Sequence, residues 1–369
     1  MDESAPALES PLTPEPPRAV VTAVSFTGQG REYFRIWIVN LALTIVTLGA
    51  YSAWAKVRRL QYFYRNTHVA GAAFDYHGDP IAIFKGRIIA AILFGAYTFS
   101  GLVGPVATLA TIVGIGAILP WLLSRSLRFR LHNTSYRGLR FRFTGSTRSA
   151  YWVFLALPVL TLLSLFLLGP MWHQRLKRYQ FGNASYGHTP FAMSAPTSDF
   201  YVLHIFAAFL GFVVVIALGS VVGVMAAAGW IGPEVSDEEA VAAASEAGAV
   251  VSVVLLAAVY VVGILAVQAF LGARIRNLVW NFTKTGEHRF ISNTRTRRLL
   301  WIQLSNFLAT ICTLGFFWPV GQIRLSRYLA ETLSVEGPPS FDHFCSADSP
   351  EEEATGDEVA GIFDFDIAF

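Results

Sequence analysis

Long apolar runs alternate with short polar segments along most of the chain. The runs cover residues 33–48, 87–123, 151–168, 201–228, 250–272 and 299–317. A helix that crosses a membrane needs about 20 apolar residues. The second run is long enough for two crossings, the fourth and fifth runs form a second such pair, and the remaining runs provide about one crossing each. The pattern predicts a polytopic helical membrane protein.

Each apolar stretch leads into a basic, aromatic helix and then into a short strand. In the segment WAKVRRLQYFYRN, Trp54, Arg58, Tyr62 and Asn66 recur at every fourth residue, which places them along one side of a helix. In RGLRFRFTG, apolar and basic residues alternate, which is typical of a strand with one apolar face. Because isolated strands are unstable, we expect these strands to pair in a small sheet outside the bilayer.

This helix and strand motif is repeated. Trp54, Arg58, Tyr62, Asn66, Thr67, Gly71, Phe74 and Gly78 match Trp121, Arg125, Phe129, Asn133, Thr134, Gly138, Phe141 and Gly145 in the same spacing. Weaker copies surround Arg175, Arg274 and Arg324. We therefore predict an all-α polytopic fold of five repeated helical-hairpin units, with short cytoplasmic strands between them. The expected units are about 21–78, 79–145, 146–195, 196–293 and 294–344.

Two topologies fit the apolar runs. Seven single crossings would place successive basic segments on opposite sides of the membrane, including the very basic loop 125–148. Lys and Arg accumulate in cytoplasmic loops, so this arrangement conflicts with the charge pattern. If every unit enters and returns as a hairpin, with TLGAY and TLGFFWP as turns, all basic motifs face the cytoplasm. We favour the hairpins, and the acidic loop near Glu234 is then expected outside.

The composition excludes an ordinary soluble protein. Hydrophobic residues make up 54% of the 369 residues and charged residues only 14%, against about 25% charged in typical soluble domains. The net charge is +3, and acidic residues concentrate in the two ends of the chain. Residues 1–20 and 345–369 are predicted to be disordered and cytoplasmic. The remaining basic part suits anionic lipid headgroups, whereas nucleic acid is not expected, because no binding motif accompanies the arginines.

Five equivalent arginines are the main candidate site. They are Arg58, Arg125, Arg175, Arg274 and Arg324. Guanidinium groups at one membrane interface could bind phosphate headgroups or an anionic substrate. The simpler interpretation is that they anchor the helices at the cytoplasmic interface.

Several polar residues lie within or directly after the apolar helices. Asn40 with Thr44, and Asn306 with Thr310, form a candidate intramembrane polar face. Such residues usually bond to a neighbouring helix, and the alternative is a substrate path. Asn66, Asn133 and Asn183 are expected to cap helix ends or turns.

The usual enzyme and metal motifs are absent from the sequence. Cys312 and Cys345 are the only cysteines, and no two histidines lie four residues apart or in an HExxH motif. Neither a glycine-rich phosphate loop nor a GxSxG motif occurs. We therefore expect no metal, no cofactor and no catalytic activity.

The segments TLGAYSAWAKVRRLQYFYRNT and GAAFDYHGDP resemble the YjgN family of bacterial inner-membrane proteins, a domain of unknown function. The resemblance covers about Phe26 to Phe344. It implies a multi-pass inner-membrane protein and brings no known catalytic residues, cofactor or substrate. Relatives encoded beside membrane metallopeptidases suggest such a peptidase as a partner.

The sequence leaves two functions open. The first is a non-enzymatic transport or permeation module in the inner membrane, with Asn40 and Asn306 along the path. The alternative is a membrane scaffold or anionic-lipid-binding protein that uses the five arginines and partners a membrane peptidase.

Overall fold

The computed structural model describes residues 19–227 and 240–338. Twelve helical elements alternate with eleven short strands in this part of the chain. The helices are α1 (Gly30–Val46), α2 (Ser52–Arg65), α3 (Pro80–Val103), α4 (Pro105–His132), α5 (Thr147–Tyr151), the π-helix η1 (Trp152–Ala156), α6 (Leu157–Leu163), α7 (Gly169–Gly182), α8 (Thr197–Ala227), α9 (Ala240–Asn281), α10 (Thr296–Cys312) and α11 (Trp318–Glu331). The strands are β1 (Val20–Ala23), β2 (Ser25–Phe26), β3 (Thr67–Val69), β4 (Ala72–Tyr76), β5 (Thr134–Tyr136), β6 (Leu139–Phe143), β7 (Ala184–Tyr186), β8 (Thr189–Met193), β9 (Thr283–Thr285), β10 (His288–Ser292) and β11 (Leu333–Gly337).

All eleven strands join in one antiparallel sheet. Its order is β1-β11-β10-β9-β8-β7-β6-β5-β4-β3-β2. Only Val24 separates β1 from β2, so one extended segment pairs with β11 along one edge and with β3 along the other. The two ends of the sheet therefore meet, and the sheet is barrel-like. Closure removes the unpaired strand edges that an open sheet would expose.

The prediction of an all-α membrane fold is confirmed in part: the chain is mostly helical and has four apolar helices long enough to cross a membrane, but its sheet is one closed sheet of eleven strands and not a small one. The individual strands are short, as expected, but the N-terminal segment supplies a partner for both free edges. The hairpins then add edge to edge into a single large sheet. The predicted disordered ends lie almost wholly outside the described residues, although β1 already begins at Val20.

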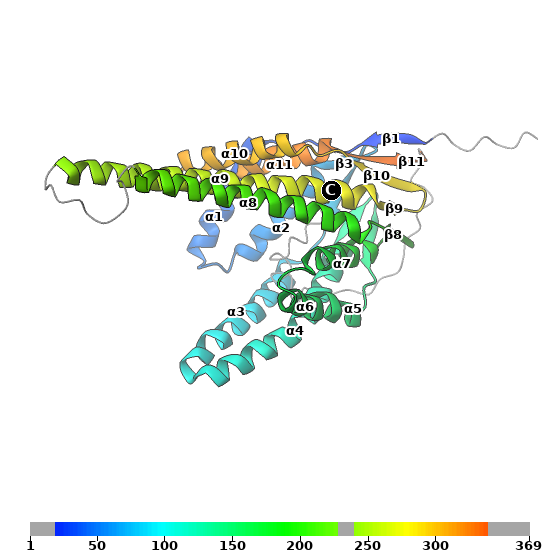
Figure 1. Ribbon diagram of the computed structural model, residues 1–369. Helices are drawn as coiled ribbons and strands as arrows, with labels where there is room; N and C mark the ends of the chain where they lie inside the picture. The colour runs from blue at the N-terminus through cyan, green and yellow to red at the C-terminus, as the bar shows by residue number, and fades with distance from the viewer. Residues whose placement is uncertain (1–18, 228–239, 339–369) are drawn as a thin grey trace, which may run out of the picture.

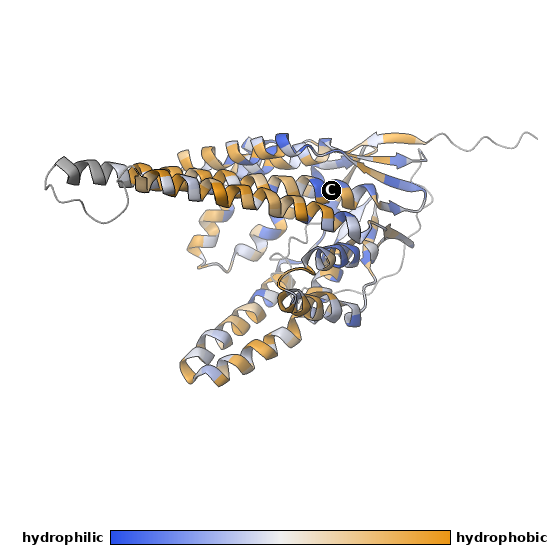
Figure 2. Ribbon diagram, viewed as in Figure 1, coloured by the Kyte–Doolittle hydropathy of each residue, from blue (hydrophilic) through white to orange (hydrophobic). Residues whose placement is uncertain are grey.

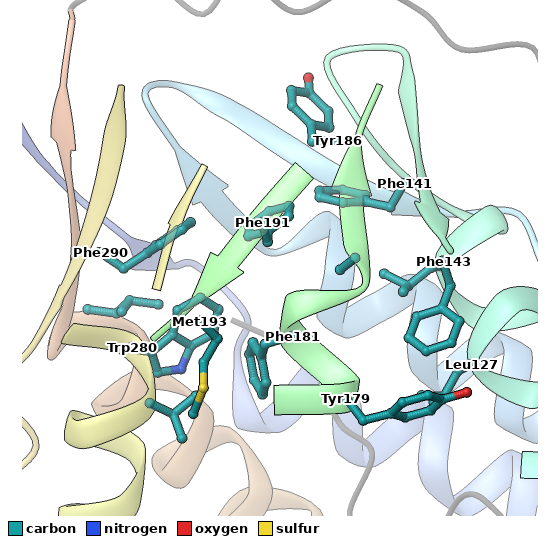
Figure 3. Packing of buried hydrophobic residues seen from close by; sticks show 14 of the residues in the cluster. Leu127, Phe141, Phe143, Tyr179, Phe181, Tyr186, Phe191, Met193, Trp280 and Phe290 are labelled. Carbon is teal, nitrogen blue, oxygen red and sulfur yellow. The ribbon is translucent and has the colours of Figure 1, made fainter. Parts of the chain in front are cut away.

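Aromatic side chains fill the interior of this barrel. Phe74, Phe141, Phe191 and Phe290 come from β4, β6, β8 and β10, and the centroids of successive rings lie 6.2, 6.3 and 5.9 Å apart. Figure 3 shows the last three of these rings. All four are at most 8% exposed. In β6 the basic residues between the apolar ones point outward, so the predicted alternation is confirmed. A small barrel packed with side chains in this way is a core and not a channel.

Two buried tyrosines tie neighbouring hairpins of the barrel together. The hydroxyl of Tyr136 donates to the carbonyl of Val69 at 2.7 Å, and the hydroxyl of Tyr186 donates to the carbonyl of Tyr136 at 2.8 Å. Burial raises the pKa of both phenols, so each hydroxyl keeps its proton and remains a donor at neutral pH.

The helices extend from the sheet in pairs (Figure 1). Four of them, α3, α4, α8 and α9, are long and apolar enough to cross a membrane, and they carry long hydrophobic stretches in Figure 2. Each of α2, α7 and α11 has only 14 residues, which is about 21 Å of helix. A bilayer core is about 30 Å thick, so these three helices are too short to span it.

Three short helix pairs turn back through similar backbone conformations. In the TLG turns, Leu48 and Leu314 have positive φ angles of 50° and 49°, and each is followed by a glycine. The hydroxyl oxygens of Thr47 and Thr313 accept the N–H groups of Tyr51 and Phe317, both at 2.9 Å. The third turn uses Ser164 in the same way, with a bond of 3.2 Å to the N–H of Leu168. These hydroxyls satisfy backbone groups that water cannot reach in an apolar surrounding.

The positions of the strands bear on the two topologies predicted from the sequence. β5 and β6, from the basic loop 125–148, and β7 and β8, from the next basic segment, belong to the same sheet. One sheet cannot have strands on both sides of a bilayer. Alternating single crossings would require strands of this sheet on both sides of a bilayer, whereas chain segments that leave the sheet and return to it would not.

Replacement of Phe141 by alanine tests the aromatic core. It removes a ring that contacts Phe74, Phe191 and Tyr186, so we expect the free energy of unfolding to fall by about 3–5 kcal/mol. Thermal unfolding in detergent, followed by circular dichroism, measures the loss. Phe209 on α8 is 65% exposed, and Phe209→Ala is the matched control, with little change expected. Equal losses in both variants would contradict a packed barrel interior.

Candidate functional site

Five backbone hydrogen bonds attach the second helix of each pair to equivalent positions around the barrel. In each case the N–H of a residue just after a strand donates to the carbonyl of a residue just after a helix. The bonds are Thr27 to Asn66, His77 to Asn133, Thr144 to Asn183, Ser194 to Phe282 and Asn293 to Thr332, with lengths of 2.9, 2.8, 2.8, 2.9 and 2.9 Å. The C-terminal ends of α2, α4, α7, α9 and α11 therefore meet equivalent rungs of the sheet.

The five candidate arginines lie at the same distance along their helices from these bonds. Each is seven residues before the last residue of its helix, as read from the helix ends at Arg65, His132, Gly182, Asn281 and Glu331. Seven residues correspond to about 10 Å of helix. We call Arg58, Arg125, Arg175, Arg274 and Arg324 the arginine belt. Even the least regular copy of the motif, around Arg274, keeps this spacing.

The members of the belt differ in what they contact. Arg58, Arg175 and Arg274 are exposed, and the Arg58 guanidinium lies over the Tyr51 ring at 5.8 Å. Arg125 is half-buried and lies 5.4 Å from the centre of the Trp121 ring. Three arginines of the belt are therefore open to a ligand or to lipid.

Arg324 forms part of a hydrogen-bonded contact between α10 and α11. Its guanidinium donates to Asn306 Oδ1 at 2.7 Å and to Ser305 Oγ at 3.1 Å. The Asn306 side chain in turn donates from Nδ2 to the carbonyl of Gly321 at 3.0 Å. This asparagine thus bonds to the neighbouring helix through both atoms of its amide.

Asn40, at the equivalent position in α1, lacks these bonds. It is 7% exposed, and its Oδ1 has no hydrogen-bond partner. Ala55 stands where Gly321 stands in the other pair, and a Cβ atom added at Gly321 would come within 3.2 Å of the Asn306 amide. The methyl group of Ala55 therefore occupies the space that the close contact requires.

The other polar residues of the predicted face bond within their own helices. Thr44 Oγ1 donates to the carbonyl of Asn40 at 2.6 Å, and Thr310 Oγ1 donates to that of Asn306 at 2.7 Å. Asn66, Asn133 and Asn183 occupy the C-cap positions of α2, α4 and α7, where each Nδ2 donates to the carbonyl four residues earlier at 2.8–2.9 Å. Each amide thus bonds to a carbonyl in the last turn of its own helix.

A histidine pair that is not evident in the sequence joins α7 to α8. His204 Nδ1 donates to the carbonyl of Phe200 at 2.7 Å, which leaves its Nε2 to accept from His173 Nδ1 at 3.4 Å. No group of three metal-ligating side chains occurs among the described residues.

A groove beside Arg175 was also missed by the sequence analysis. It has a volume of about 1,010 Å³ and lies between α5, η1 and α6 on one side and α7 on the other. Arg148 and Arg178 line it together with Arg175. Because Arg148 belongs to a different helix from the other two, no local spacing in the sequence connects them.

Four long apolar helices and exposed apolar turns are the features of a membrane protein. The chain belongs to the family described as bacterial protein of unknown function (DUF898), whose sequence profile matches residues 21–362. This result agrees with the YjgN resemblance found in the sequence.

Curated relatives carry the name inner membrane protein YjgN. The chain is 33% identical to the Salmonella typhimurium protein over 144 residues, which cover 39% of this chain and 36% of the relative. It is 34% identical to the Escherichia coli K12 protein over 145 residues, or 37% of this chain and 34% of the relative. The match thus spans about a third of the length of these relatives. No solved structure matches the chain.

Asn306 and Asn40 provide a matched pair of substitutions. Asn306→Leu leaves the Arg324 guanidinium and the Gly321 carbonyl without their partner, so we expect the free energy of unfolding to fall by about 1–3 kcal/mol. Asn40→Leu removes an amide whose Oδ1 is unpaired, and its effect is expected to be smaller. Thermal unfolding of both variants in detergent makes the comparison. A larger loss from Asn40→Leu would overturn the structural role assigned to Asn306.

Proposed function

We propose that the protein is a multi-pass inner-membrane scaffold that binds anionic lipid headgroups beneath its barrel. The observation that carries this proposal is the equal distance of the arginine belt from the helix ends at the barrel. One basic side chain near an anionic membrane surface contributes about 1 kcal/mol of attraction. The three exposed members, Arg58, Arg175 and Arg274, form a surface that favours anionic lipids around the protein.

In the proposed topology the chain consists of five hairpin units around the barrel. The pairs α3/α4 and α8/α9 cross the bilayer, and the three short pairs enter only one leaflet. The exposure of the turn residues Leu48, Leu165 and Leu314, which is 96%, 84% and 90%, supports this arrangement, because apolar turns of this kind are suited to lipid. Their backbone groups are satisfied by Thr47, Ser164 and Thr313, as an apolar medium requires.

The charge on the barrel supports a cytoplasmic orientation. Exposed basic residues on its strands and turns are Arg137, Arg140, Arg142, Lys284 and Arg289. Basic residues accumulate on the cytoplasmic side of inner-membrane proteins. Since β1 begins at Val20 and β11 ends at Gly337, both tails then start on that side. The acidic loop around Glu234, which lies outside the described residues, would be on the opposite side.

The transport or permeation function predicted from the sequence has less support. Aromatic rings fill the barrel, Asn306 is engaged between two helices, and the hydroxyls of Thr44 and Thr310 bond to their own helices. A path along Asn40 and Asn306 would need these bonds to open. The absence of catalytic activity and the metallopeptidase partner stay predictions of the sequence.

Lipid enrichment around the purified protein tests the scaffold proposal. In nanodiscs of phosphatidylglycerol and phosphatidylcholine, native mass spectrometry should detect enrichment of phosphatidylglycerol around the wild-type protein. Arg58→Gln combined with Arg274→Gln removes two exposed belt charges. Because one charge contributes about 1 kcal/mol, the loss of each should lower the preference for phosphatidylglycerol over phosphatidylcholine about fivefold.

The control removes the same charge from the barrel strands. Arg142 and Lys284 are exposed on β6 and β9, above the belt, and replacement of both by glutamine should leave the enrichment unchanged. An equal loss in the belt variant and the control, or no loss in either, would refute a role for the belt.

A further inference from the structure

The groove between α5, η1, α6 and α7 is lined by three arginines, Arg148, Arg175 and Arg178. No hydrogen bond or ion pair to Arg148, Arg175 or Arg178 occurs in the described part of the chain. Related arginines elsewhere are engaged, since Arg128 donates to the carbonyl of Gly145 and Arg327 to that of Gly28. The groove thus brings three positive charges together without a neutralising partner among the described residues.

A local substitution explains why Arg178 is not engaged. Arg128, Arg178 and Arg327 all lie three residues after a belt arginine. Arg128 bonds to the loop before α5, and Arg327 bonds to the loop before α1. In α7 the corresponding bond is made by Gln174, whose Nε2 donates to the carbonyl of Ala195 at 3.0 Å. Arg178 is therefore left to line the groove.

The wall opposite the arginines is apolar. Trp152, Leu155, Val159 and Leu160 line it and are 51%, 37%, 50% and 39% exposed. Arg148 lies near the barrel end of this helical segment, whereas Val159 and Leu160 lie nearer the turn at Ser164. The groove therefore changes from basic to apolar along the direction from the headgroup region into the bilayer.

A π-helix shapes this wall. Pro158 has no N–H group to donate to the preceding turn, and the helix widens at η1, just before this proline. The carbonyl of Val153 accepts instead from the indole Nε1 of Trp172 on α7, at 2.9 Å. This bond holds the two sides of the groove together. π-Helical turns frequently occur at functional sites.

We propose that the groove binds one anionic phospholipid, with its phosphate among Arg148, Arg175 and Arg178 and its acyl chains along Trp152 and Val159. Guanidinium groups bind phosphate oxygens in paired hydrogen bonds. The apolar wall would contribute nothing to a free phosphate ion but would cover an acyl chain. A volume of about 1,010 Å³ accommodates the headgroup and the first part of the chains. The inference rests on the proposed orientation of the barrel.

Native mass spectrometry of the full chain tests the groove. The protein is delipidated in detergent and reloaded with phosphatidylglycerol, with phosphatidylcholine or with inorganic phosphate. We expect one molecule of phosphatidylglycerol to remain bound under conditions that remove phosphatidylcholine, and phosphate not to displace it. Displacement by millimolar phosphate, or equal retention of both lipids, would overturn the assignment to an anionic phospholipid.

Two variants test separately the charge of the groove and the space along its apolar wall. Arg148→Gln combined with Arg178→Gln removes charge, and Val159→Trp fills the apolar wall while all three arginines stay. Each should weaken retention of the single phosphatidylglycerol at least tenfold, with an unchanged unfolding temperature. Unchanged retention in both would refute the groove.

The belt variant Arg58→Gln with Arg274→Gln separates the two proposals, because neither residue lines the groove. It should keep the tightly bound lipid and lose only the general enrichment of anionic lipid. If the belt variant loses enrichment while both groove variants retain the tight lipid, the scaffold proposal stands and the groove proposal fails. If the groove variants lose the tight lipid while the belt variant changes nothing, the groove stands and the belt fails.

Discussion

The extended segment from Val20 to Phe26 pairs with the last strand of the sheet along one edge and with β3 along the other. Residues near the two ends of the described chain thereby complete a closed ring of strands. Closure turns short two-stranded hairpins, which would be unstable alone, into a sheet without free edges around an aromatic core. The chain leaves this ring through the first helix of a pair and returns to it through the second, because the second helix of each pair leads directly into a strand.

The backbone bonds at the ends of the second helices follow from the closed ring and explain the arginine belt. Each bond ties a helix end to the strand that precedes the helix pair, at equivalent rungs. A residue at a fixed distance from the helix end must then lie at a fixed distance from the barrel. Arginines at that distance place their positive charges equally far from the barrel. No contact among the arginines themselves is needed to align them.

Local patterns in the sequence predicted the individual helices, strands and turns. Closure of the sheet, the bonds of the asparagines and the groove depend on contacts between residues far apart in the chain. The alternation in LRFRF and the TLG turns depend on neighbouring residues, and both appear in the structure as expected. The pairing of Ala23 with Ser334 joins residues far apart in the chain, so no local pattern could predict closure. The different roles of Asn40 and Asn306 depend on Ala55 and Gly321 in another helix. The groove likewise needs side chains from separate helices.

The depth of the belt in the membrane is the most direct test of this account. Single spin labels are placed at Arg58, Arg175 and Arg274, the exposed members, in a chain with Cys312 and Cys345 replaced by serine. Power-saturation electron paramagnetic resonance in bilayers reports the depth of each label from its contact with oxygen and with a water-soluble nickel complex. The account predicts one common depth, near the phosphate groups of a single leaflet. Labels at clearly different depths, or on opposite sides of the bilayer, would contradict it.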